Sequence, residues 1–233
     1  MQDIVLNWSS GKDAALALYH LLQTGDYRVR SLLTSLSEAY GRISMHGVRE
    51  EVLERQAKHM QLPLQKIYLP EDADMDTYNR IMGDTVAAIK QAGIDTMGFG
   101  DIFLEDLRAY REQQLATAGM KALFPLWKKN TAGLVKEVED CGIKALIVCV
   151  NDRYLDQSFL GRFIGRDLLA DLPDHVDPCG EYGEYHSLVI DAPYFSAPLP
   201  VTPGETVFRE YRVNEDSRQG FYFLDVLLKD EAS

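Results

Sequence analysis

The residues best suited to chemistry lie near the start of the chain, where two serines, a glycine, a lysine and an aspartate occupy positions 9–13. Apolar segments at 4–6 and 14–22 flank this run, so we expect a strand, a tight polar loop and a helix in that order. Such a loop gathers backbone N–H groups and a helix N-terminus at one point, which suits a bound phosphate. Lys12 would add a mobile, exposed positive charge, and Gly11 would let the backbone approach the ligand closely.

Two common nucleotide-binding patterns do not fit this 9–13 loop. The GxxxxGK[ST] phosphate loop requires glycine where Leu6 stands and serine or threonine where Asp13 stands. The dinucleotide pattern GxGxxG fails at Gly98-Phe99-Gly100, because Phe103 occupies the place of the third glycine. Five residues alone leave open an ordinary strand-to-helix turn with a solvated lysine.

The loop must be positioned by the elements around it, and the first 150 residues alternate between strand and helix patterns. This alternation predicts a doubly wound α/β fold with a mainly parallel sheet and helices on both faces. Ligands of such sheets bind at the carboxyl ends of the strands, where Thr34, Gly100 and Asp101 join the 9–13 loop. We expect strands at 3–7, 29–34, 64–69, 96–100, 121–124 and 144–150, and helices at 12–24, 46–60, 75–92, 104–118 and 131–141.

The pattern changes after residue 150. A shorter helical stretch at 160–172 precedes strand-like segments at 187–191, 206–213 and 221–228, with prolines at 193, 198, 200 and 203 between them. We expect residues 1–150 to form an ATP-binding α/β domain and residues 151–233 a smaller α+β domain that binds substrate.

Composition narrows the class of protein. A net charge of −12 disfavours a broad nucleic-acid-binding face, although a local basic patch is not excluded. No apolar run is long enough to span a membrane, and the N-terminus has no basic signal region. The three cysteines include no CxxC pair, which indicates a reduced, cytoplasmic setting without structural zinc. A homodimer is compatible with the sequence.

Several stretches carry a family resemblance. The 9–13 loop is similar to the SGGKDS loop of the N-type ATP pyrophosphatases, with Ser10 replacing a glycine and Ala14 replacing the final serine. Later stretches resemble one family of that superfamily, the diphthine–ammonia ligases, although Tyr154 stands where glycine is common and members vary at Asp101. These stretches are Phe99-Gly100-Asp101-Ile102 with Arg108 and Glu112, Pro125-Leu126-Trp127, Leu155-Asp156 with Leu160-Gly161-Arg162, and the segment Gly180-Glu181-Tyr182-Gly183-Glu184-Tyr185-His186.

The resemblance implies an adenine nucleotide α-hydrolase-like fold and an ATP-dependent, AMP-forming ligase that uses Mg²⁺. A carboxylate on a small molecule or a protein would attack the α-phosphate of ATP, and ammonia would then displace AMP to form an amide. None of the three cysteines has the context of a glutaminase nucleophile, so free ammonia is the simpler nitrogen source.

The resemblance also implies roles for individual residues. The implied ATP-binding residues are Asn7, Ser9, Ser10, Gly11, Lys12, Asp13, Thr34 and Gly100; the catalytic residues are Lys12, Asp13 and Asp101, with Asp13 near the metal; and the substrate-binding residues are Arg108, Glu112, Glu181 and Glu184. We expect the 180–186 segment to face the 9–13 loop across a cleft, and replacement of Lys12 to leave the fold intact.

Each role has a structural alternative. Asp13 and Asp101 could be helix N-caps, and Arg108 and Glu112 could pair with each other four residues apart on a helix. Glu181 and Glu184 could belong to a solvated loop. The histidines at 46 and 186 lack partners at metal-binding spacing, so a surface or strand position is the better interpretation for both.

Two other functions use the same loop. A tRNA-thiolating ATP pyrophosphatase would need paired cysteines and a basic surface, and neither is present. A non-catalytic nucleotide-binding sensor would bind ATP without turnover, so product formation separates it from a ligase.

Overall fold

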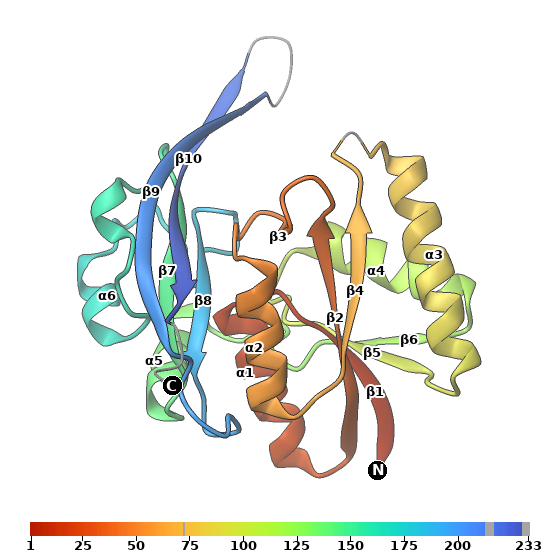
Figure 1. Ribbon diagram of the computed structural model, residues 1–233. Coiled ribbons are helices and arrows are strands. Elements are labelled where there is room, and N and C mark those ends of the chain that lie inside the picture. The colour runs from red at the N-terminus through yellow and green to blue at the C-terminus, as the bar shows by residue number, and fades with distance from the viewer. Residues whose placement is uncertain (72, 213–216, 230–233) are drawn as a thin grey trace.

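The computed structural model describes residues 1–71, 73–212 and 217–229, in which two β-sheets lie side by side with helices between and around them (Figure 1). The last residue of the expected strand at 206–213, Val213, lies outside the described residues. None of the described helices is long and apolar enough to cross a membrane.

Six of the described strands form the first sheet. Strands β1, β2, β4, β5 and β6 pair in parallel, and the two-residue strand β3 pairs antiparallel with the far end of β2. Their alternation with helices confirms the predicted doubly wound, mainly parallel class. The bounds are β1 Gln2–Asn7, β2 Tyr27–Ser37, β3 Arg42–Ile43, β4 Leu64–Leu69, β5 Thr96–Gly98 and β6 Lys121–Leu123.

Helices cover both faces of this sheet. Helices α3 (Met75–Gln91) and α4 (Glu105–Thr117) contribute buried side chains to a core on one face. Helices α1 (Lys12–Thr24) and α2 (Glu50–Met60) lie on the other face, between the two sheets. Alanines and leucines make α1 buried on several sides, and Gly25 ends it in the left-handed conformation with φ 67°.

Four antiparallel strands in the order β8-β7-β10-β9 form the second sheet. The expectation that strand 144–150 continues the parallel sheet is wrong, because β7 pairs with β8 and β10. The division of the chain near residue 150 stays a prediction. The bounds are β7 Lys144–Asn151, β8 Tyr185–Asp191, β9 Val201–Arg212 and β10 Arg218–Leu228.

Shorter helices accompany the second sheet. Helix α5 (Thr131–Asp140) precedes β7, and α6 (Arg166–Asp171) is shorter than the helix expected at 160–172. A 3₁₀ turn, η1 (Gln157–Phe159), precedes it, and Gly161 has a left-handed φ of 78°, which interrupts a helix at that point.

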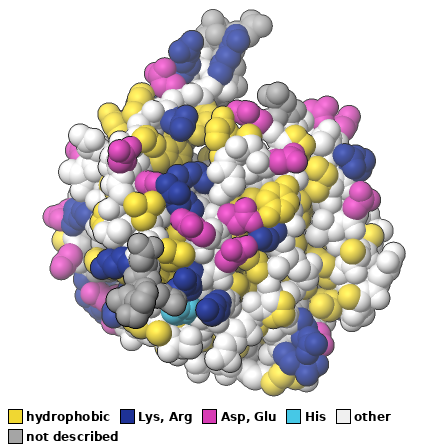
Figure 2. Space-filling model, in the orientation of Figure 1, with side chains coloured by type: hydrophobic (Ala, Val, Ile, Leu, Met, Phe, Trp, Pro, Cys, Tyr) yellow, Lys and Arg dark blue, Asp and Glu magenta, His cyan; other side chains and the backbone are white. Residues whose placement is uncertain are grey.

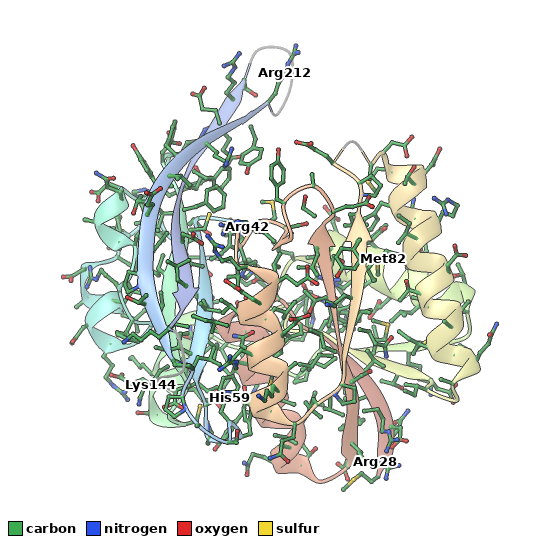
Figure 3. The ribbon with its side chains drawn as sticks, in the orientation of Figure 1. Arg28, Arg42, His59, Met82, Lys144 and Arg212 are labelled. Carbon is green, nitrogen blue, oxygen red and sulfur yellow. The ribbon has the colours of Figure 1, made fainter. Side chains whose placement is uncertain are left out.

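The two sheets share one hydrophobic core. A single cluster joins buried side chains of β1, α1 and α2 with those of β7, β8 and β10. Asp225 on β10 adds ion pairs to Arg49, with 2.6 Å between charged atoms, and to Arg42, at 2.9 Å. In Figure 3 Arg42 lies between β3 and β10. The first sheet is therefore fixed against the second, and the residues at their junction have defined positions.

Candidate active site

The 9–13 loop begins where β1 ends and is held by its neighbours in the sheet. The Trp8 N–H donates to the carbonyl of Leu33 at 2.8 Å, and the buried Thr34 hydroxyl donates to the Trp8 carbonyl at 2.6 Å. Ser10 has a left-handed φ of 69°, which turns the chain sharply before α1. Its Oγ atom is buried and has no hydrogen-bond partner among the described residues.

A buried glutamine joins this loop to the second sheet. Gln56 of α2 accepts a hydrogen bond from the Trp8 indole at 3.0 Å and donates to the carbonyls of Ser10 at 3.2 Å and Val189 at 2.7 Å. The Val189 N–H in turn donates to the Ser10 carbonyl at 2.9 Å. Because buried polar groups are costly unless paired, this network fixes the backbone of the loop. The sequence analysis missed Gln56.

Lys12 is buried, with 2% of its surface exposed, so the expectation of a mobile, exposed lysine is wrong. Its Nζ atom lies 2.9 Å from the Asp13 carboxylate, donates to the Cys179 carbonyl and stands 5.0 Å from the centre of the Tyr185 ring. Burial alone would lower the pKa of Lys12, but the Asp13 carboxylate and the neighbouring Tyr185 and Cys179 hold that pKa above its usual value. Lys12 is therefore a fixed positive charge.

The first turn of α1 also places Asp13 in the site. The N-cap of α1 is Gly11, so the interpretation of Asp13 as an N-cap is wrong. Burial raises the pKa of Asp13 above its usual value; Lys12 opposes that shift, and the carboxylates of Asp177 and Asp101 add to it. The carboxylates of Asp101 and Asp177 and the ammonium group of Lys12 therefore all interact electrostatically with the Asp13 carboxylate.

Gly100 and Asp101 follow β5 and lie against this turn. A Cβ atom on Gly100 would come within 2.8 Å of the Ala14 nitrogen and the Asp13 carbonyl carbon, so only glycine fits the close approach. Asp101 pairs with Arg111 of α4, with 2.7 Å between its carboxylate and the guanidinium. The N-cap of α4 is Leu104, so the interpretation of Asp101 as a helix cap is wrong.

The 180–186 segment lies beside the 9–13 loop, since the Tyr185 ring centre is 5.0 Å from Lys12 Nζ. Glu181 accepts a hydrogen bond from the Ile102 N–H at 2.8 Å, and the Ser187 hydroxyl, one residue after the segment, accepts one from the Lys12 N–H at 3.1 Å. The proximity predicted from the sequence is confirmed, and the cleft between the segment and the loop stays a prediction. A role of Glu181 in substrate binding stays a prediction.

Glu184 has a structural position. It is 1% exposed, and its two oxygens accept hydrogen bonds from the N–H groups of Asp177 and Tyr182, both at 2.9 Å. Asp177 in turn accepts from the N–H groups of Cys179 and Glu181. These bonds argue against direct substrate contact by Glu184 and assign it, with Asp177, to shaping the segment. The sequence analysis did not single out Asp177.

Two histidines that the sequence analysis set aside lie together beside Gly11. The rings of His46 and His186 are 4.6 Å apart, and a Cβ atom on Gly11 would lie 3.0 Å from the His46 ring. His46 Nδ1 lies 3.2 Å from the Ser187 carbonyl. Burial lowers the pKa of His46 to about 4 and the pKa of His186 well below its usual value, so both rings are neutral at pH 7. No local pattern connects positions 46 and 186, so spacing could not reveal this pair.

Arg108 and Glu112 form the structural pair that the sequence left open. The Arg108 Nε–H donates to the Glu112 carboxylate at 2.8 Å, and the guanidinium lies 4.6 Å from the centre of the Trp127 ring. These contacts hold both side chains on the outer surface of α4. A substrate-binding role for either residue stays a prediction, as does the role of Asn7 and Ser9 in binding ATP.

Burial of Glu181 leads to a pH prediction. Burial, aided by Asp13, raises the pKa of Glu181 from 4.5 to about 7 against the opposing effect of the Ile102 N–H. Through Glu181 alone, the folded chain binds up to one more proton than the unfolded chain between pH 4.5 and 7, so the contribution of Glu181 to the free energy of unfolding falls as the pH rises through that window, by up to about 3 kcal/mol. The lowered pKa values of His46 and His186 act on stability in the opposite direction, so the test is the difference in melting temperature between wild type and Glu181→Gln, which should change across this window.

Glu105→Gln is the matched control, because the Glu105 carboxyl is 64% exposed. The wild-type slope between pH 4.5 and 7 should persist in that variant. An unchanged slope in Glu181→Gln would show that Glu181 titrates near its ordinary pKa.

Comparison with known families finds matches over most of the chain. Residues 1–122 match the family described as diphthamide synthase N-terminal domain, and residues 130–226 match the diphthamide synthase C-terminal domain. The first match includes the 9–13 loop, and the second includes the 180–186 segment.

Similar curated proteins are named diphthine–ammonia ligase. The one from Schizosaccharomyces pombe is 26% identical over 222 residues, which cover 85% of this chain and 36% of that protein. The one from Homo sapiens is 24% identical over 223 residues, covering 85% of this chain and 82% of that protein. The one from Rattus norvegicus is 28% identical over 143 residues, covering 56% and 54%. The match thus spans about a third of the S. pombe protein and about half of the rat protein.

Proposed function

Because this chain belongs to the diphthamide synthase family, we propose that it is an ATP-dependent, AMP-forming amide ligase of the diphthine–ammonia ligase type. The family resemblance predicted from the 9–13 loop and the 180–186 segment is confirmed by the two family matches. The observation that carries the proposal is the contact of Lys12 with the Asp13 carboxylate and the Tyr185 ring, because it joins the 9–13 loop to the 180–186 segment, which we expect to bind the acceptor.

In the proposed reaction a carboxylate oxygen of the acceptor attacks the α-phosphorus of ATP, and the bond to the β-phosphate oxygen breaks. Pyrophosphate leaves and an acyl-adenylate remains. Ammonia then attacks the acyl carbon, AMP leaves, and the nitrogen loses a proton to give the amide. Adenylation makes a good leaving group, so the protein mainly has to orient the reactants and balance charge.

The 9–13 loop supplies the charge balance. The first-turn N–H groups of α1 have no intrahelical partners, and they lie beside the fixed charge of Lys12. Lys12 would stabilise negative charge that develops on the phosphate oxygens. The Ser10 hydroxyl, buried and without a partner among the described residues, is a further donor for a phosphate oxygen.

Asp13 suits magnesium bound together with ATP. Mg²⁺ in nucleotide sites keeps several waters and takes one or two carboxylates along with phosphate oxygens. The described residues contain no group of three or more His, Cys, Asp or Glu able to hold a metal ion by themselves. Asp13, whose side chain is 28% exposed, fits such a shared site, with Asp101 and Asp177 near enough to influence its pKa. Bound there, Mg²⁺ would screen the charge of the triphosphate.

We assign to Glu181 the role of general base for the attacking ammonia. Its carboxyl has a pKa of about 7 and interacts electrostatically with Lys12, Asp13 and Asp101. A carboxylate near neutrality can accept a proton from the attacking nitrogen, since general bases act best with a pKa near the working pH. The acceptor is a carboxylate carried by a small molecule or a protein.

The cysteines disfavour the thiolating alternative. Cys149 and Cys179 are buried, and burial raises the pKa of both thiols well above the usual value. Sulfur transfer proceeds through the thiolate, so these environments oppose it.

A product assay tests the proposal. The protein is incubated with ATP, Mg²⁺, ammonium and a panel of carboxylates, and we expect AMP and pyrophosphate in equal amounts with the amide. Hydroxylamine in place of ammonium should trap the acyl-adenylate as a hydroxamate. Stoichiometric ADP would overturn the assignment of α-phosphorus attack, and ATP binding without turnover across the panel would favour the sensor.

A further inference from the structure

Strand β9 has features that the proposed reaction does not use. It forms one edge of the second sheet, since β10 is the only strand that pairs with it among the described residues. Its side chains are exposed from Glu205 through Arg212, including three large apolar ones: Val207 at 39%, Phe208 at 46% and Tyr211 at 49%. A long, exposed, partly apolar edge is a template for pairing with another strand.

The shape of the molecule leaves room for such a partner. The β9–β10 hairpin projects beyond the rest of the chain at the top of Figure 1, and Arg212 lies near its end in Figure 3. Figure 2 shows basic and acidic side chains next to each other on this projection. An antiparallel partner strand would run alongside β9 on the edge that faces away from β10.

The charges of β9 are complementary to those of a second copy of the same strand. When two identical strands pair antiparallel around a two-fold axis, the axis passes through a residue that faces itself. With Val207 on the axis, Glu205 of each copy faces Arg209 of the other, on the same face of the sheet as the two valines. Two opposite-charge pairs then flank one apolar pair, and this regular register ends at Glu205, because β9 has a bulge between Pro203 and Thr206.

Neighbouring registers are unfavourable. An axis at Glu205, Arg209 or Glu210 would place two like charges directly opposite each other. An axis one residue to either side of Val207 would face that valine with a charged side chain. Among the positions from 205 to 210, the axis at Val207 is the one that pairs opposite charges.

We propose that two copies of this chain form a two-fold dimer by pairing their β9 edges around Val207. The four-stranded sheets of the two copies become one continuous sheet of eight strands. The pairing satisfies the outward backbone groups of both edges and covers Val207 and Tyr211. The two 9–13 loops remain separate, so each copy keeps a complete site.

Charge exchange tests the register. The mass of the purified wild-type protein, measured by light scattering over a concentration series, should approach twice that of one chain. Arg209→Glu alone and Glu205→Arg alone should each reduce it to one chain, because each places two like-charged pairs across the axis. The double variant Glu205→Arg with Arg209→Glu should restore the dimer, since it reverses both pairs.

Cross-linking gives an independent test. Facing Cα atoms in an antiparallel pair are about 4.5 or 5.5 Å apart, both within disulfide range, so Val207→Cys should form a covalent dimer on mild oxidation. Phe208→Cys is the control, because Phe208 of one copy is diagonal to Phe208 of the other at about 7–8 Å. Wild type at single-chain mass over the whole series, no rescue by the charge exchange, or equal cross-linking by both cysteines would each overturn the proposal.

Discussion

Replacement of Lys12 by alanine should lower the rate of AMP formation by about 10²–10³-fold, the usual cost of removing one preorganised group that stabilises charge in a transition state. Asp13 and the Cys179 carbonyl hold the Lys12 ammonium group in place, and the side chain is buried. A water molecule in the variant would therefore not supply the same fixed positive charge. The variant should also lose about 1–3 kcal/mol of stability, because the buried Cys179 carbonyl and the Asp13 carboxylate lose their partner. This second effect replaces the expectation of an intact fold, which assumed an exposed lysine.

The measurement is the initial rate of AMP release well below the melting temperature of the variant, with folding verified by circular dichroism. Lys90→Ala is the matched control. Lys90, in the last turn of α3, also pairs with an aspartate, Asp95, which precedes the amino end of β5, opposite the end that leads to Gly100. Wild-type rates in folded Lys12→Ala protein would refute a role for this charge in the reaction.

Gly100→Ala should reduce the rate by at least about tenfold without removing any functional group. The added Cβ would lie 2.8 Å from the Ala14 nitrogen and the Asp13 carbonyl carbon, and both belong to the backbone of α1. The first turn of α1 must therefore shift relative to β5, and displacements near 1 Å are costly in a site that works by orientation. Overpacking of this kind also costs about 1–3 kcal/mol of stability.

Gly83→Ala is the control for the glycine change itself. Gly83 lies in α3, and its added Cβ would meet nothing within 4 Å. That variant should keep the wild-type rate and gain a few tenths to about 1 kcal/mol of stability from the better helix propensity of alanine. Kinetics of Gly100→Ala equal to those of wild type would show that the approach of β5 to α1 does not position the site.

Local signals in the sequence predicted the first sheet well. Helix α1 and strand β4 have the predicted bounds, because Gly25 and Pro63 mark their limits and the apolar pattern fills the space between. Strand β3 was missed, since two residues carry no periodicity. Strand β9 begins five residues earlier than expected: Pro203 was interpreted as part of a turn, but an edge strand tolerates proline.

Two errors explain most of what the sequence analysis missed in the site: the predicted start of helix α2 and the predicted exposure of the Lys12 side chain. Helix α2 begins at Glu50 and not at residue 46, because Gly47 has a left-handed φ of 69°. The residues before α2 thus form a loop that carries His46 to Gly11. The burial of Lys12 depends on Cys179 and Tyr185, more than 160 positions away, and no local pattern records such a contact.

The contacts between the two sheets also limit which sequence changes the chain can accept during evolution. The two family matches end at residue 122 and begin at residue 130, yet Gln56 from the first holds Val189 from the second and the loop at Ser10. A substitution at Gln56 would therefore leave the carbonyls of Ser10 and Val189 without this donor, whereas a substitution at Val189 keeps its backbone groups. Recombination that exchanged one half alone would separate Gln56 from the Val189 carbonyl with which it now pairs.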